Sequence, residues 1–131
     1  MLVLDTNTLI YFFKGQGRVA ENLWQQSPQE IGIPTIVLYE LQVGIGKSTS
    51  PEKRMEQLSA LLSVVNILPF AQAEANTAAQ IRVALENKGE PIGAYDILIA
   101  ATALANRSVL VTRNTNEFSR IENLSLVDWY S

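Results

Sequence analysis

Three acidic residues lie where a carboxylate is unusual. Asp5 ends an apolar run at residues 2–4, Glu40 lies within an apolar segment, and Asp96 lies near the start of another. Each has an ordinary interpretation on its own: a helix N-cap, a glutamate that extends to water, and an acid stabilised by a helix dipole. Together they indicate a cation site, because carboxylate oxygens are the hard ligands that suit Mg2+ and Mn2+.

The rest of the composition narrows the chemistry. The chain contains no histidine and no cysteine. These absences exclude a thiol nucleophile, a disulfide framework, a histidine-based triad and a cysteine or histidine zinc site. Demanding chemistry in this chain would therefore depend on carboxylates and on a cation that they bind.

Helical spacing predicts the surroundings of two of the acids. Glu40 shares a helical face with Ile36, Val37, Val43 and Gly44. We expect this face to be buried, and no basic residue lies one turn away to pair with Glu40. Asp96 shares its face with Ile92, Ile99, Ala100 and Ala103. Because a buried carboxylate is costly unless it is paired or bound to a cation, both positions favour a metal site.

Hydrophobic periodicity predicts strands that alternate with helices. The expected strands are residues 1–4, 31–33, 66–70, 109–112 and 126–129. The expected helices are residues 9–13, 18–26, 35–46, 52–65, 71–88 and 94–106, with Pro34 in the first turn of the third. This alternation favours an α/β fold, a three-layer α/β/α sandwich with a mostly parallel five-stranded sheet. In such a fold the carboxyl ends of the strands lie at one edge, where the three acids are expected to converge.

Length and charge limit the class of protein. The chain has 131 residues, of which 47% are hydrophobic, so residues 1–131 are expected to form one domain. With 13 acidic and 10 basic residues the net charge is -3, which excludes a broad basic surface for nucleic acid. No apolar stretch approaches the length of a membrane span, and no basic segment precedes the first apolar run. We therefore expect a soluble cytoplasmic protein.

Four motifs, in this order along the chain, resemble those of PIN-domain proteins. They are Leu4-Asp5-Thr6-Asn7, Tyr39-Glu40-Leu41 with Gly44, residues 89–96, and Val111-Thr112-Arg113-Asn114. The segments at residues 96–100 and 114–118 are similar to the VapC-type toxins of bacterial toxin–antitoxin pairs. The resemblance spans essentially the whole chain, and four motifs in the right order are more specific than any one of them.

The resemblance implies a PIN-like fold, an Mg2+- or Mn2+-dependent endoribonuclease, a homodimer, and inhibition by a small cognate antitoxin. Structured RNA, transfer RNA in particular, is the substrate that it implies. Asp5 and Asp96 would be the principal metal ligands, with Glu40 binding directly or through water. Asn114 stands where many relatives have aspartate, so the fourth ligand is Asn114, Glu117 or water. That choice decides whether the site holds one ion or two.

We expect the bound cation to activate a water for in-line attack on an RNA phosphodiester, leaving a 5'-phosphate and a 3'-hydroxyl. Arg113 and Lys14 are candidates for contact with RNA phosphates. Tyr11, Phe12 and Phe13 form an aromatic cluster that packs in the core or lines a groove for the antitoxin. Candidates to orient ligands or waters, which are otherwise turn or cap residues, are Thr6, Asn7, Thr112 and Asn114.

Two other functions fit parts of the pattern. A haloacid-dehalogenase-like phosphatase also has an aspartate after its first strand, but here Asn7 replaces its second aspartate. No paired aspartates follow later in the chain, so we rank this class below a ribonuclease. The second alternative is an RNA- or protein-binding module that keeps the fold without catalysis, against which the presence of all three acids argues.

Overall fold

The five strands of the protein form one sheet, in which all four strand pairings are parallel. The computed structural model describes all 131 residues. The strands are β1 (Leu2–Leu4), β2 (Ile31–Pro34), β3 (Asn66–Leu68), β4 (Val109–Val111) and β5 (Leu126–Val127). Their order across the sheet is β3-β2-β1-β4-β5. The prediction of a five-stranded parallel sheet is confirmed.

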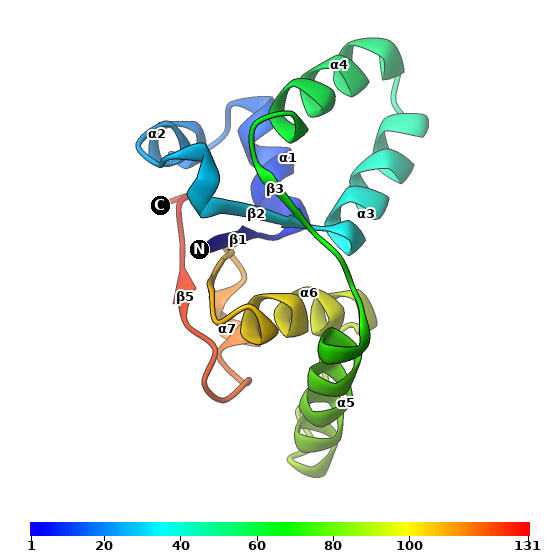
Figure 1. Cartoon of the computed structure of the whole chain (residues 1–131), viewed down its shortest axis with the longest axis vertical. Coiled ribbons are helices and arrows are strands. Elements are labelled where there is room, and N and C mark those ends of the chain that lie inside the picture. Colours follow the sequence, from blue (N-terminus) through cyan, green and yellow to red (C-terminus); the bar gives the residue numbers. More distant parts are fainter.

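Helices cover both faces of this sheet (Figure 1). Between β1 and β3 the chain forms α1 (Thr6–Lys14), α2 (Val19–Trp24), α3 (Thr35–Gly46) and α4 (Pro51–Leu62). After β3 it forms α5 (Gln72–Asn87), α6 (Ala94–Ala105) and α7 (Thr115–Phe118). Helices α1, α3 and α4 lie on one side of the sheet, and α5 and α6 lie on the other. The three-layer α/β/α sandwich is therefore confirmed.

The core lies where β1 and β4 meet the helices. Val3, Leu4, Leu110 and Val111 are completely buried, as expected for strands that are covered on both faces. On the α6 side, Ala100, Ala101 and Ala103 are also completely buried. Small side chains let this helix approach the sheet closely, which brings the first turn of α6 near the carboxyl end of β1.

The order of the strands places a crevice at the end of β1. From β1 the chain continues to β2 and β3 on one side, whereas β4 and β5 lie on the other. The connections on the two sides of β1 run on opposite faces, so the chain segments that leave β1 and β4 diverge there. Open parallel sheets place their ligand sites at such a switch in direction.

The expected and observed elements differ mainly at their ends. Helix α1 begins at Thr6 rather than at residue 9, because Asp5 caps it directly after the strand. Pro34 is the last residue of β2 and caps α3, and does not lie within the first turn of that helix. A 3-10 helix, η1 (Pro28–Glu30), and the four-residue α7 were not predicted, because elements this short show no hydrophobic period.

None of the helices is both long enough and apolar enough to cross a membrane.

Candidate active site

Asp5 is held at the carboxyl end of β1 by hydrogen bonds on two sides. Its carboxylate accepts a hydrogen bond of 2.9 Å from the main-chain N–H of Thr8, which makes it the N-cap of α1. Its main-chain N–H donates a hydrogen bond of 3.2 Å to the carbonyl of Val111, at the end of β4, and the neighbouring side chain of Thr112 acts to lower the pKa of its carboxyl group. Only 5% of Asp5 is exposed, and this burial raises its pKa above the usual range despite both threonines. Asp5 is therefore the N-cap of α1 and also a buried carboxyl group whose charged form is disfavoured.

Glu40 reaches the same region from α3. The hydroxyl of Thr6 donates a hydrogen bond of 2.7 Å to its carboxylate, so the first residue of α1 orients it. The expectation that the whole face around Glu40 is buried is wrong: Val43 is 41% exposed and Gly44 is also exposed. Because α3 is apolar on most of its faces, helical spacing alone does not indicate which stripe meets the core. The buried stripe contains Val37 and Leu41.

Asp96 lies in the first turn of α6 and is half-buried. Burial and then repulsion from Asp5, Glu117 and Glu40 raise its pKa to about 6. A helix N-terminus by itself would lower the pKa of an aspartate, so the interpretation of Asp96 as a simple dipole-stabilising acid fails. Ile99, Ala100 and Ala103 on its face are buried, as predicted, whereas Ile92 lies before α6 begins and is half-buried.

Two further candidates come from the segment after β4. The side-chain amide of Asn114 donates a hydrogen bond of 3.1 Å to Glu117, and the main-chain N–H of Asn114 donates to the hydroxyl of Thr112 at 3.0 Å. Asn114 thus holds Glu117, whose charge raises the pKa of Asp96. We call Asp5, Glu40, Asp96 and Glu117 the acidic cluster.

The acidic cluster has the chemistry of a site for a divalent cation. Burial, and then the charges of the other members, raise the pKa values of Asp5 and Asp96, and no member belongs to any of the four ion pairs of the structure. In this arrangement no three carboxyl groups close around one point, because Glu40 is turned towards Thr6 and Glu117 towards Asn114. The donor set fits Mg2+ or Mn2+ in kind and in charge, since uncompensated carboxylates require a cation.

Arg113 lies beside this cluster but is bound to aromatic rings. Its guanidinium carbon lies 3.6 Å from the centre of the Tyr130 ring and 5.7 Å from that of Tyr11. The neighbouring side chain of Tyr11 raises the pKa of Arg113. A shallow pocket of about 290 Å³ is lined by Asp5, Asn7, Tyr11, Arg113 and Asn114. Arg113 is therefore placed where a group bound at Asp5 would meet it.

Lys14 lies elsewhere. It is the last residue of α1, whose nine residues separate it from Asp5 by roughly 13 Å along the helix axis. It lines a groove of about 350 Å³ together with residues of α3 and of the start of α4. Contact of Lys14 with RNA stays a prediction, and this residue does not belong to the pocket of Asp5.

The sequence contains no local signal for the role of Tyr130. Arg113 follows β4 and Tyr130 follows β5, and only the parallel pairing of these two strands brings the two side chains together. Of the aromatic cluster, Tyr11 packs edge-on against Tyr130 at 4.8 Å, whereas Phe12 packs against Phe13 and Trp24. All three members of the cluster pack against the core, so core packing accounts for much of this cluster.

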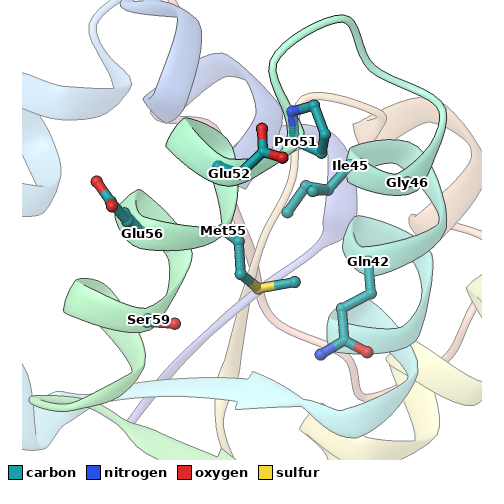
Figure 2. A pocket seen from close by; sticks show the side chains of 8 residues that line it. All are labelled: Gln42, Ile45, Gly46, Pro51, Glu52, Met55, Glu56 and Ser59. Atoms are coloured by element: carbon teal, nitrogen blue, oxygen red, sulfur yellow. The ribbon is translucent and has the colours of Figure 1, made fainter.

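A larger hollow of the surface, of about 590 Å³, is remote from these groups. It lies between α3 and α4, where Met55 projects from α4 into the space facing Ile45 and Gln42 of α3 (Figure 2). Glu52 and Glu56 line the same hollow. None of its lining residues belongs to the acidic cluster, so size alone does not identify the chemical site.

A parallel sheet with carboxylates gathered at the end of its central strand defines the class of protein. A family model described as "PIN domain" matches residues 2–124, and the chain therefore belongs to the PIN-domain family.

Among PIN-domain proteins, the chain is similar to the VapC ribonucleases. It is 36% identical to Ribonuclease VapC2 of Rickettsia felis, in an alignment that covers 97% of this chain and 96% of the relative. It is 34% identical to the tRNA(fMet)-specific endonuclease VapC of Salmonella typhimurium, with the same coverage of both chains. A crystal structure of VapBC2 from Rickettsia felis bound to a promoter DNA fragment has a TM-score of 0.90 and 38% identity, over 98% of both chains.

Proposed function

We propose that this protein is a divalent-cation-dependent endoribonuclease of the VapC type, which cleaves structured RNA, transfer RNA above all. The observation that carries this proposal is the acidic cluster, four carboxylates without a basic partner at the end of β1. The names of its relatives, which include an endonuclease specific for a transfer RNA, support the same reaction and substrate class.

Each residue of the site has a proposed task. Asp5 and Asp96 would hold Mg2+ or Mn2+, and Glu40 and Glu117 would complete the set directly or through water. When bound, the cation supplies an activated water and neutralises charge on the phosphate. Thr6 orients Glu40 and Thr8 orients Asp5 through the hydrogen bonds described above, and the side chain of Thr112 neighbours Asp5. Arg113 binds a phosphate of the RNA, because a guanidinium matches phosphate oxygens with paired donors.

We expect purified protein to cut RNA at discrete sites in Mn2+ or Mg2+, and a chelator to stop this cleavage completely. Total RNA is the first substrate, and sequencing of the cleaved ends identifies the RNA and the bond. Ends with a 5'-phosphate and a 3'-hydroxyl are expected. Restoration of cleavage by added Mn2+ controls for damage by the chelator, and cleavage that persists in the chelator would contradict the proposal. Intact RNA in every metal would favour the non-catalytic binding module.

The relatives of this chain and the residue at position 7 argue against the phosphatase alternative. Family membership and relatives named as ribonucleases favour phosphodiester cleavage over transfer of a phosphate to an aspartate. Asn7 is exposed on α1 and lines the pocket of Asp5, where a phosphatase of the haloacid-dehalogenase class would use an aspartate.

We further propose that the protein is the toxin of a toxin–antitoxin pair and forms a homodimer. The related structures are complexes described as VapBC, which supports a small protein partner for this chain. The groove between α1, α3 and α4 is lined by Ile10, Phe13 and Leu41, and suits an apolar segment of the antitoxin. Such a segment would direct a basic side chain towards the acidic cluster and so compete with cation and RNA.

Expression of the protein alone is expected to arrest growth, and co-expression of its antitoxin is expected to restore it. The matched control is an Asp5→Asn variant, which should be harmless whether or not the antitoxin is present. Sedimentation of the purified protein and of the complex measures whether the toxin is dimeric. Normal growth during expression of intact, RNA-cleaving protein would count against the toxin role.

A further inference from the structure

Arg113 is the only basic residue that lines the pocket of Asp5, yet the two side chains do not pair. Neither residue belongs to any of the ion pairs of the structure. A guanidinium and a carboxylate that line the same pocket are well suited to a two-pronged ion pair. In this structure Arg113 instead contacts another group.

The contact is the face of an aromatic ring. The guanidinium carbon of Arg113 lies 3.6 Å from the centre of the Tyr130 ring, well within the range of a cation–π interaction. The ring of Tyr11 packs edge-on against Tyr130 at 4.8 Å, and the side chain of Tyr11 contributes to raising the pKa of Arg113. Asp128, on the same C-terminal segment, adds its charge to those that act on Arg113.

Tyr130 is itself fixed by its main chain and by a glycine. Its carbonyl accepts a hydrogen bond of 3.0 Å from the N–H of Arg18, and its own N–H donates to Asp128 at 2.7 Å. Gly17 has a φ of +61°, and a Cβ atom built on it would lie 2.6 Å from the Tyr130 ring. The turn between α1 and α2 thus leaves room for this ring only because residue 17 is glycine.

We propose that Tyr130, supported by Tyr11, is a positioning residue that holds the guanidinium of Arg113 at the rim of the pocket, off Asp5 and towards an RNA phosphate. The RNA part of this inference rests on the proposed function, whereas the effect on the carboxylates does not. Without the ring, Arg113 would turn to Asp5 and neutralise it. A divalent cation would then compete with a guanidinium for the same carboxylate.

The first test measures binding of Mn2+ to purified variants by calorimetry, without RNA. A Tyr130→Leu variant keeps apolar bulk and loses the ring, and is expected to bind Mn2+ about tenfold more weakly, as the strength of a cation–π contact implies. Tyr130→Phe keeps the ring and should bind Mn2+ within about twofold of wild type. Adding Arg113→Gln to Tyr130→Leu removes the competing guanidinium and is expected to restore the affinity.

The second test reads the position of Arg113 directly. The ring current of Tyr130 is expected to shift the NMR resonance of the Arg113 Nε–H. Tyr130→Phe should retain this shift, and Tyr130→Leu should abolish it. In cleavage assays at saturating Mn2+, Tyr130→Leu is expected to raise KM for RNA about tenfold with little change in kcat. Trp24→Leu is the matched control, because it removes another ring, which packs edge-on against Phe12 and carries no cation.

The outcomes separate this inference from the proposed function. Unchanged Mn2+ affinity in Tyr130→Leu would overturn the positioning role, even if RNA cleavage is intact. Failure of Arg113→Gln to restore the affinity would also overturn it, because a loosened fold would then explain the loss. If wild type cuts no RNA but the Mn2+ results are as expected, the proposed function fails and the positioning of Arg113 stands.

Discussion

An Asp5→Asn variant is expected to lose RNA cleavage by about a thousandfold or more while it stays folded. Asparagine removes the negative charge that the cation needs. The carboxylate of Asp5 accepts a hydrogen bond from the main-chain N–H of Thr8, and the amide oxygen of asparagine can accept the same bond. The steady-state rate on RNA and the affinity for Mn2+ should therefore fall together.

Stability measurements separate the two roles of Asp5. Asparagine is as good an N-cap as aspartate, and a neutral side chain relieves the burial of a charge, so Asp5→Asn should unfold no earlier than wild type. Asp5→Ala removes the cap as well and is expected to cost about 1 kcal/mol of stability. Thermal or denaturant unfolding compares the two variants.

The control for this experiment removes a carboxylate of another kind. Glu86 forms an exposed ion pair of 2.8 Å with Arg82 on α5, far along the chain from the acidic cluster. Glu86→Gln should therefore cut RNA at the wild-type rate. Cleavage by Asp5→Asn at a substantial fraction of the wild-type rate, or its persistence in a chelator, would exclude the proposed mechanism.

The architecture could be predicted because nearly every element is marked by its own residues. The apolar runs of β1 and β4 are continuous, as buried parallel strands require, and the expected helix at residues 35–46 coincides with α3. Pro34 and the glycines supply the ends of the elements. The short η1 and α7 escaped prediction because three or four residues cannot show a period.

The candidate site was only partly predictable, for physical reasons that differ from residue to residue. Asp5 is marked by its place after a buried strand, and the structure places it with Glu40 and Asp96 at one crevice. The contacts that orient these side chains could not be predicted from the sequence. The bond from Thr6 to Glu40 spans 34 residues, and the stacking of Arg113 on Tyr130 depends on two strands being neighbours. Such contacts are products of the topology, and no local pattern encodes them.

The second large effect concerns Asp96, whose replacement by asparagine is expected to stabilise the metal-free protein near neutral pH. Burial and the neighbouring acids raise its pKa from 3.8 to about 6. Between these two values the folded state binds more protons than the unfolded state, so the free energy of unfolding falls as the pH rises. The loss begins near pH 4 and is complete above about pH 6.

Asp96→Asn is expected to raise the free energy of unfolding by about 1 to 2 kcal/mol above pH 6. This gain is smaller than the full pKa shift implies, because the half-exposed carboxylate is screened by water. At pH 4 wild type is largely protonated here, and the two proteins should be nearly equally stable. Unfolding in urea at a series of pH values, in the presence of chelator, measures this difference. Burial also raises the pKa of Asp5, so the free energy of unfolding of the Asp96→Asn variant still falls as the pH rises.

The burial and the repulsion that raise the pKa of Asp96 also link the stability of the protein to its binding of a cation. A cation that binds the ionised cluster stabilises the folded state by an amount that grows with the logarithm of its concentration over its dissociation constant. Added Mn2+ should therefore raise the melting temperature of wild type strongly above pH 6 and weakly near pH 4, and should raise that of Asp96→Asn far less. A variant that gains stability without the metal, and loses both cleavage and the response to Mn2+, would show that the charge of Asp96 is kept for cation binding at a cost to the fold. Equal responses of the two proteins to Mn2+ would remove Asp96 from the set of ligands.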